Sequence, residues 1–131
     1  LDPHAYARAL AAYRLPGVVF RPARFTPTFH KWAGRTCGGV QLHVTERARF
    51  KPFLTGLALV AAARRLAPRR FAWRRPPYEF ERRRLPIDIL LGTDRIRRAI
   101  ERGAAVADVE RAWSGDLARW RRRRERVLAY R

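Results

Sequence analysis

Residues 15–45 read LPGVVFRPARFTPTFHKWAGRTCGGVQLHVT, and this stretch decides the predicted fold. Val18 to Phe25 follows a Pro-Gly turn and is rich in β-branched and aromatic residues, which is typical of a strand. Pro22 has no amide proton to donate to a neighbour, so we expect this strand at a sheet edge or beside a bulge. Cys37 to Thr45 predicts a second strand, and we expect the two strands to pair.

The second strand separates polar from apolar side chains, because alternate residues of a strand point to opposite faces. Val40, Leu42 and Val44 share one face, which we expect to pack inward. The other face is unusually polar and consists of Cys37, Gly39, Gln41 and His43. The adjacent glycines Gly38 and Gly39 indicate a close backbone approach, either by a neighbouring strand or by a ligand. Between the strands, Thr26 to Thr36 predicts a long, shaped loop.

Helices are predicted on both sides of this strand pair. Asp2 and Pro3 are typical of a helix start, Pro52 opens a helix that Pro68 closes, and Thr93 begins another that ends before Gly103. The last helix carries an apolar stripe that we expect to bury both of its indoles against the sheet; it consists of Val109, Trp113, Leu117 and Trp120. The predicted fold class is α/β (α+β), a small mixed sheet flanked by about four to five helices in a single compact domain.

Composition limits the function. The chain has 131 residues, 47% of them hydrophobic, which is enough for a real core, and a formal net charge of +19. Such a charge draws a chain towards nucleic acid, anionic lipid or acidic glycan. Only Lys31 and Lys51 among the 30 basic residues are lysines, and the arginines are spread over almost every segment, which an Arg-rich coding bias explains. We therefore expect no specific nucleic-acid partner. The longest uncharged apolar run, Gly56 to Ala63, is too short to span a membrane.

Catalytic signals are weak. Glycoside hydrolysis usually needs two carboxyl groups across the scissile bond, and the acidic residues here are better explained by salt bridges and helix starts. No closely spaced His or Cys motif predicts a metal site, and we expect no cofactor. Cys37 is the single cysteine. It is either a nucleophile with His30 or His43 as its base, or, more commonly for such a thiol, a structural group.

Residues 15–45 resemble the start of the carboxy-terminal domain of NamZ-type exo-β-N-acetylmuramidases. Further stretches continue the resemblance in order along nearly the whole chain: TGLAL at 55–59, PYEF at 77–80, LPIDILLGTD at 85–94, and the terminal pattern of Trp113, Leu117, Trp120 and Tyr130. The first stretch and LPIDILLGTD are the specific ones. Residues 1–131 would then form the carboxy-terminal auxiliary α/β domain of a peptidoglycan glycoside hydrolase.

The resemblance implies that an upstream Rossmann-like domain of the same protein carries the catalytic carboxylates, and that this domain closes the substrate cleft. It implies muramic-acid-containing peptidoglycan fragments as substrate and a bacterial periplasmic or secreted location. No residue here matches the family's catalytic motifs, so we expect no catalytic residue and no activity in the isolated chain. The implied cleft candidates are His30, Lys31, Cys37, Gln41, His43, Tyr78 and Glu79. Trp32 stands where relatives often carry a smaller or polar residue.

Two physical roles follow for these candidates. Lys31 is suited to pair with the lactyl carboxylate of muramic acid, and Gln41 or His43 to hydrogen-bond sugar hydroxyls. The alternative function belongs to another class: an Arg-rich, non-catalytic binding module for anionic polymers, either nucleic acid or cell-wall glycan.

Overall fold

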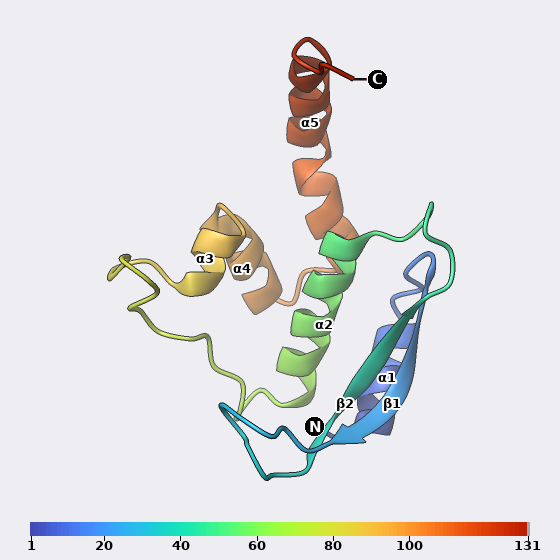
Figure 1. Cartoon of the computed structure of the whole chain (residues 1–131), viewed down its shortest axis with the longest axis vertical. Helices are drawn as coiled ribbons and strands as arrows, with labels where there is room; N and C mark the ends of the chain where they lie inside the picture. The colour runs from blue at the N-terminus through green and yellow to red at the C-terminus, as the bar shows by residue number, and fades with distance from the viewer. Residues whose placement is uncertain (131) are drawn as a thin grey trace. The chain divides into compact units, whose positions relative to one another are not determined.

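The computed structural model describes residues 1–130 and divides into two compact units, with the boundary between Trp73 and Arg74. The first unit contains α1 (Pro3–Ala11), β1 (Val18–Phe25), β2 (Cys37–Val44) and α2 (Pro52–Leu66), and the second contains α3 (Pro86–Leu90), α4 (Asp94–Glu101) and α5 (Val106–Glu125) (Figure 1). The predicted class of helices beside a small sheet is confirmed. The expected single domain thus consists of two units. Among residues 1–130, no helix is long and apolar enough to cross a bilayer.

The sheet is a hairpin of two antiparallel strands. Val18 pairs with Val44 at one end and Phe25 with Cys37 at the other, so every residue of β1 has a partner in β2. Both predicted strands are confirmed to within one residue. The sheet was predicted to be mixed, but in the described residues it is purely antiparallel, because it consists of two strands joined by one loop. Each strand is therefore an edge strand, which is why Pro22 is tolerated in β1.

The apolar face of the hairpin is only partly covered, contrary to the inward packing predicted for it. Val18 is buried and Val40 half-buried, whereas Leu42 and Val44 are exposed. Helix α1 packs against both strands. On the β1 side, Val18 is buried and Phe20 half-buried, although their partners in β2 are the exposed Val44 and Leu42. The uncovered part of the face therefore lies along β2.

Helix α1 begins as predicted at the Asp2 cap. The Ala5 amide donates to Asp2 Oδ1 at 2.6 Å, and this hydrogen bond holds the pKa of the Asp2 carboxyl below its usual value. Tyr6 and Leu10 are buried on the inner face of the helix. The Tyr6 hydroxyl donates to the Leu59 carbonyl of α2 at 2.9 Å, and burial raises the Tyr6 pKa to about 12. Tyr6 therefore links α1 to α2.

Gly38 admits the start of this helix. A Cβ at position 38 would overlap the carbonyl oxygen of Leu1 and lie 3.1 Å from Cδ of Pro3. The close approach predicted from the paired glycines is therefore made by the amino-terminal backbone, which is neither of the two alternatives left open. At Gly39 a Cβ would meet only the ring of Phe25, a side chain able to move.

Helix α2 shares the core of the first unit with α1, and each helix buries five residues. Those of α2 are Leu54, Thr55, Leu57, Ala58 and Ala62. Phe53, at the start of α2, is 47% exposed.

The second unit follows the predicted capping signals but not the predicted burial of its last helix. Thr93 Oγ1 accepts from the Arg95 amide at 3.3 Å, and Gly103 adopts φ +76° just beyond α4. In α5, Val106 and Val109 are buried, whereas Trp120 is 54% exposed. The expectation that the stripe buries both indoles is wrong for Trp120 because α5 continues for several turns beyond its contact with α4.

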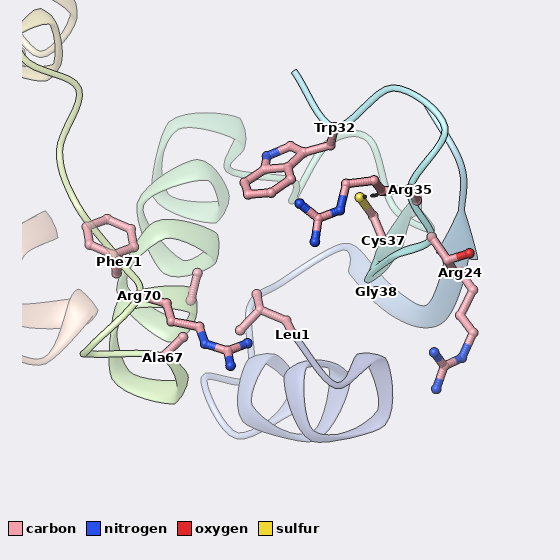
Figure 2. A pocket seen from close by; sticks show the side chains of 11 residues that line it. Leu1, Arg24, Trp32, Arg35, Cys37, Gly38, Ala67, Arg70 and Phe71 are labelled. Atoms are coloured by element: carbon pink, nitrogen blue, oxygen red, sulfur yellow. Dashed lines mark hydrogen bonds between the residues drawn. The ribbon is translucent and has the colours of Figure 1, made fainter. Parts of the chain in front are cut away.

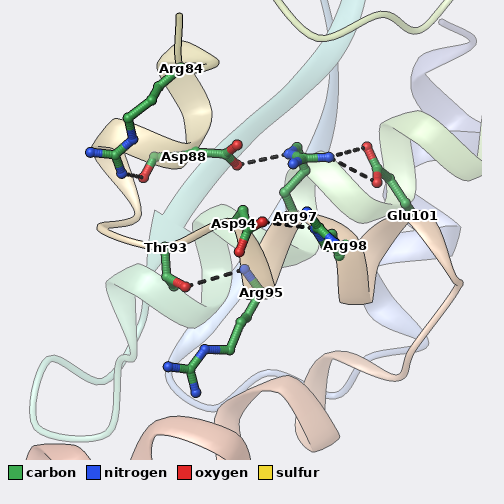
Figure 3. Close-up of polar contacts among 8 residues, drawn as sticks. All are labelled: Arg84, Asp88, Thr93, Asp94, Arg95, Arg97, Arg98 and Glu101. Atoms are coloured by element: carbon green, nitrogen blue, oxygen red, sulfur yellow. Dashed lines mark hydrogen bonds and ion pairs between the residues drawn. The ribbon is translucent and has the colours of Figure 1, made fainter.

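A buried ion pair joins α3 to α4 (Figure 3). Arg97 Nε donates to Asp88 Oδ1 at 2.8 Å, and its Nη1 lies 3.0 Å from both carboxylate oxygens of Glu101. The hydrogen bonds from Arg97, first to Asp88 and then to Glu101, raise the pKa of its guanidinium. The Asp88 and Arg97 side chains are 9% and 15% exposed, so neither charge has water as an alternative partner.

We predict that Asp88→Ala lowers the free energy of unfolding by about 3 kcal/mol, since it leaves Arg97 buried with half of its partners. Asp94→Ala is the matched control. Asp94 pairs with Arg98 at 2.8 Å in the same helix, but both side chains are largely exposed, so about 0.5 kcal/mol is expected. Urea unfolding followed by circular dichroism measures both. Equal losses for the two variants would contradict the assignment of Asp88 as the structural carboxylate.

Candidate functional site: a basic hollow beside Trp32

The loop between the two strands has an unusual backbone. His30, Trp32 and Gly34 all have positive φ, of 59°, 72° and 72°. Hydrogen bonds hold the loop, from the Gly34 amide to the Pro27 carbonyl at 2.8 Å and from the Ala33 amide to the His30 carbonyl at 3.2 Å. A left-handed conformation is costly for a residue as large as tryptophan, and such strain is typical of functional loops.

This loop overhangs a hollow of about 520 Å³ within the first unit (Figure 2). Its wall comes from the loop, the start of β2, the amino terminus and the end of α2. The lining residues are Leu1, Arg24, Trp32, Arg35, Thr36, Cys37, Gly38, Ala63, Ala67, Arg70 and Phe71. The volume lies in the range of small-molecule sites, and aromatic walls with few polar groups are typical of them.

Trp32 is the centre of the charged side of this hollow. The Arg35 guanidinium lies 5.1 Å from the centre of its ring and the Lys31 ammonium 5.3 Å from it. Figure 2 shows the Arg35 guanidinium directly beside the indole, while Arg70 reaches towards Leu1 from the side of α2. Cation–π contacts of this kind position a guanidinium without neutralising it.

Three arginines therefore surround the hollow: Arg24, Arg35 and Arg70. In the part of the chain that the structure describes, none of them forms an ion pair with a carboxylate. Among the described residues ion pairs hold a minority of the other arginines, for example Arg97 with Asp88 and Arg98 with Asp94, so the three at the hollow are distinguished by facing one cavity. A cavity bordered by unpaired guanidinium groups favours an anionic ligand, and a planar fork suits a carboxylate in particular.

The predicted site residues of the first unit lie in different positions relative to this hollow. Cys37 lines it, and its thiol contacts the Arg35 carbonyl at 3.5 Å. Lys31 stacks on Trp32 at the edge, and His30 is exposed with its ring 4.9 Å from that of Phe29. Gln41 and His43 are exposed farther along β2, where Gln41 accepts a hydrogen bond from Arg21.

Tyr78 and Glu79 belong to the second unit. Tyr78 and Glu81 exchange two backbone hydrogen bonds, of 2.9 and 3.0 Å, around a tight turn in which Glu79 has φ +51°. Glu81 accepts from the Arg83 and Arg84 amides, and these hydrogen bonds lower the pKa of its carboxyl. Glu79 is thus exposed at the tip of a well-held turn.

Sequence reasoning missed Trp32, Arg24, Arg35 and Arg70 as site residues. Trp32 was noted only as a departure from the resemblance. The available signal was that Lys31 directly precedes Trp32 and Arg35 follows it by three residues, which places two cations near one aromatic ring. No local pattern connects Arg70, at the end of α2, with the loop between the strands, because that contact depends on tertiary structure.

The carboxylates offer no acid and base pair. The two whose pKa is shifted, Asp2 and Glu81, are lowered by backbone amides, and a general acid needs the opposite shift. Several others are held in ion pairs with arginine. Among residues 1–130, no three His, Cys, Asp or Glu side chains gather closely enough to hold a metal ion.

These features define a small α/β domain with a basic, aromatic-walled hollow. Residues 1–130 match the family model described as exo-beta-N-acetylmuramidase NamZ, C-terminal, and the chain belongs to this family. It is 36% identical over 121 residues to the peptidoglycan beta-N-acetylmuramidase NamZ of Bacillus subtilis (strain 168), covering 92% of this chain and 27% of that protein. The resemblance predicted from the sequence is confirmed.

A solved structure has the same fold. The crystal structure of a DUF1343 family protein from Bacteroides fragilis superimposes with a TM-score of 0.79 at 21% identity, covering all of this chain and 33% of that one. The chain thus spans about a quarter to a third of the length of these relatives.

We predict that Cys37 reacts faster with an anionic disulfide, 5,5′-dithiobis(2-nitrobenzoate), than with neutral 4,4′-dithiodipyridine after correction for intrinsic reactivity. The positive field of the hollow concentrates anions, and the thiol is the single one in the chain. Absorbance at low salt measures the rates. Arg35→Gln should slow only the anionic reagent, several-fold, and 0.5 M salt should have the same effect. Arg47→Gln, in the turn after β2, is the control; equal slowing in both variants would contradict a local field.

Proposed function

We propose that this domain binds the N-acetylmuramic acid end of peptidoglycan fragments and forms one wall of the substrate cleft of an exo-β-N-acetylmuramidase. The supporting observation is the hollow beside Trp32, in which three unpaired arginines and two aromatic rings face the same space. N-acetylmuramic acid differs from N-acetylglucosamine by a lactyl ether, which adds one carboxylate to an otherwise neutral sugar. The arginines of the hollow are suited to pair with this carboxylate, and family membership supports peptidoglycan sugars as the class of substrate.

Each side of the hollow has a part in this proposal. Arg35, held against Trp32, is the proposed partner of the lactyl carboxylate, with Arg24 and Arg70 adding to the positive field. The exposed ring of Trp32 offers an apolar platform for the sugar. Cys37 lines the same space, and Lys31 stacks on the Trp32 ring. His30, Gln41 and His43, and in the second unit Tyr78 and Glu79, are proposed as further cleft residues with hydrogen-bonding groups.

The glycosidic bond is broken elsewhere in this proposal. The described carboxylates are used as helix caps and ion pairs, so the reacting acids are assigned to another, Rossmann-like domain of the same polypeptide. The much greater length of the relatives leaves room for such a domain. This domain then contributes binding energy and orientation, which raise the rate by holding the terminal sugar in place.

We expect residues 1–131 to bind N-acetylmuramic acid at least tenfold more tightly than N-acetylglucosamine, as measured by calorimetry or tryptophan fluorescence. A charge-assisted hydrogen bond is worth about 1.5–3 kcal/mol, and 1.4 kcal/mol corresponds to a factor of ten. Arg35→Gln should remove the preference for the acidic sugar while leaving the weaker binding of the neutral one.

Arg47→Gln, which keeps the same net charge as Arg35→Gln, should retain the preference. Equal affinity for the two sugars would refute the proposed role of the arginines. If the arginines instead serve a general module for anionic polymers, both variants should weaken binding to heparin or nucleic acid equally, and added salt should abolish it.

We also expect the isolated chain to release no nitrophenol from 4-nitrophenyl N-acetylmuramide, because the two carboxyl groups whose pKa is shifted, Asp2 and Glu81, both have it lowered, whereas hydrolysis needs one carboxyl with a raised pKa as the acid. The intact protein is the positive control. Release of nitrophenol by purified residues 1–131 would place the catalytic groups within this domain and contradict the assignment of catalysis to another domain.

A further inference from the structure

Helix α5 has one apolar stripe whose burial changes along its length. At 100° per residue, its members fall within one face of the helix: Val106, Val109, Trp113, Leu117 and Trp120. The first two are 4% exposed and lie at the end that contacts α4. Leu117 and Trp120 are 37% and 54% exposed on the same face. The stripe therefore continues past the surface that covers it.

The uncovered part is large for a surface helix. A twenty-residue helix is about 30 Å long, and its last two turns have little tertiary packing to stabilise them. Val127, Leu128 and Tyr130 add exposed apolar side chains just beyond the helix end. A continuous apolar surface of this kind usually marks an interaction site.

Arginines border this part of the stripe. Six of the eight residues from Arg119 to Arg126 are arginine, and Glu125 is the single acid among them. Arg119 pairs with Asp116, and Arg124 lies 5.2 Å from the Trp120 ring. Arg121 and Arg123, which flank the stripe, form no ion pair in the described residues. A partner that covers the stripe is expected to carry Asp or Glu around an apolar groove.

We propose that the surface formed by Leu117, Trp120 and the neighbouring arginines docks onto an acidic, apolar-grooved face of the polypeptide that the relatives carry beyond the region matched here. The matched region is 27% of the Bacillus subtilis protein and 33% of the Bacteroides fragilis chain, so both have a large remainder available as partner. This inference rests on the proposed function only for the existence of that second domain. It concerns a different surface from the hollow beside Trp32.

A membrane surface is the less favoured occupant. A helix that lies in a bilayer interface needs an apolar face along its whole length, whereas Val106 and Val109 at the start of this stripe are already buried. Within the helix, only Leu117 and Trp120 remain prominently available to lipid. Two anchors separated by one turn fit a pocket in a protein better than they fit a lipid surface.

Amide hydrogen exchange of residues 113–125 in the intact protein, compared with residues 1–131 alone, tests this proposal. We expect exchange at least tenfold slower in the intact protein. Trp120→Gln in the intact protein should restore fast exchange, whereas Arg122→Gln, on the opposite face of α5, should not. Equal exchange rates in the intact protein and the isolated chain would overturn the proposal.

Two further outcomes would also overturn it. Protection of the isolated chain by phosphatidylglycerol vesicles, without protection in the intact protein, would assign the surface to membranes. Protection that grows with the concentration of the isolated chain would assign it to a second copy. Binding of N-acetylmuramic acid by the isolated chain, with and without Trp120→Gln, reports on the proposed function separately, because Trp120 takes no part in the hollow.

Discussion

The close approach of the amino-terminal backbone to Gly38 is the contact on which the first unit depends. Because position 38 has no Cβ, the chain at Leu1 reaches the start of β2, and α1 then follows the hairpin with Tyr6 directed at α2. The same approach places Leu1 at the base of the hollow and leaves Trp32 and Arg35 above it (Figure 2). A larger residue at 38 would move α1, and with it one wall of the site. The packing of α1 and the shape of the hollow therefore both depend on the absence of a side chain at position 38.

Local patterns predicted the parts of the fold that depend on local chemistry. The Asp2 and Thr93 caps, the Gly103 stop and the hairpin strands depend on neighbours within a few residues, and the structure has all of them. The site was harder to predict, because Arg70 and Trp32 are far apart in sequence and meet only after α2 has packed on α1. The candidate residues taken from the resemblance border the hollow at Cys37 and Lys31, but the resemblance gave no reason to choose arginines.

Amphipathic periodicity likewise predicted which face of α5 is apolar, but not what covers it. The stripe from Val106 to Trp120 is regular, and its regularity says nothing about where the partner surface ends. Coverage depends on the length of α5 relative to the elements beside it, and in the first unit Leu42 and Val44 of β2 are likewise left exposed. In both cases the apolar pattern of the sequence predicts a buried surface, but the described residues leave part of that surface exposed.

The charge of this chain has different meanings in different places. Where arginine pairs with Asp88, Asp94 or Asp116, the ion pair is part of the scaffold. Around Trp32 and along the end of α5, arginines outnumber the acids, and an anionic partner would relieve the repulsion among like charges. An even spread of arginine through the sequence thus conceals uneven pairing in the structure. Both proposed binding surfaces are places where arginines lack a carboxylate within ion-pair distance in the described residues.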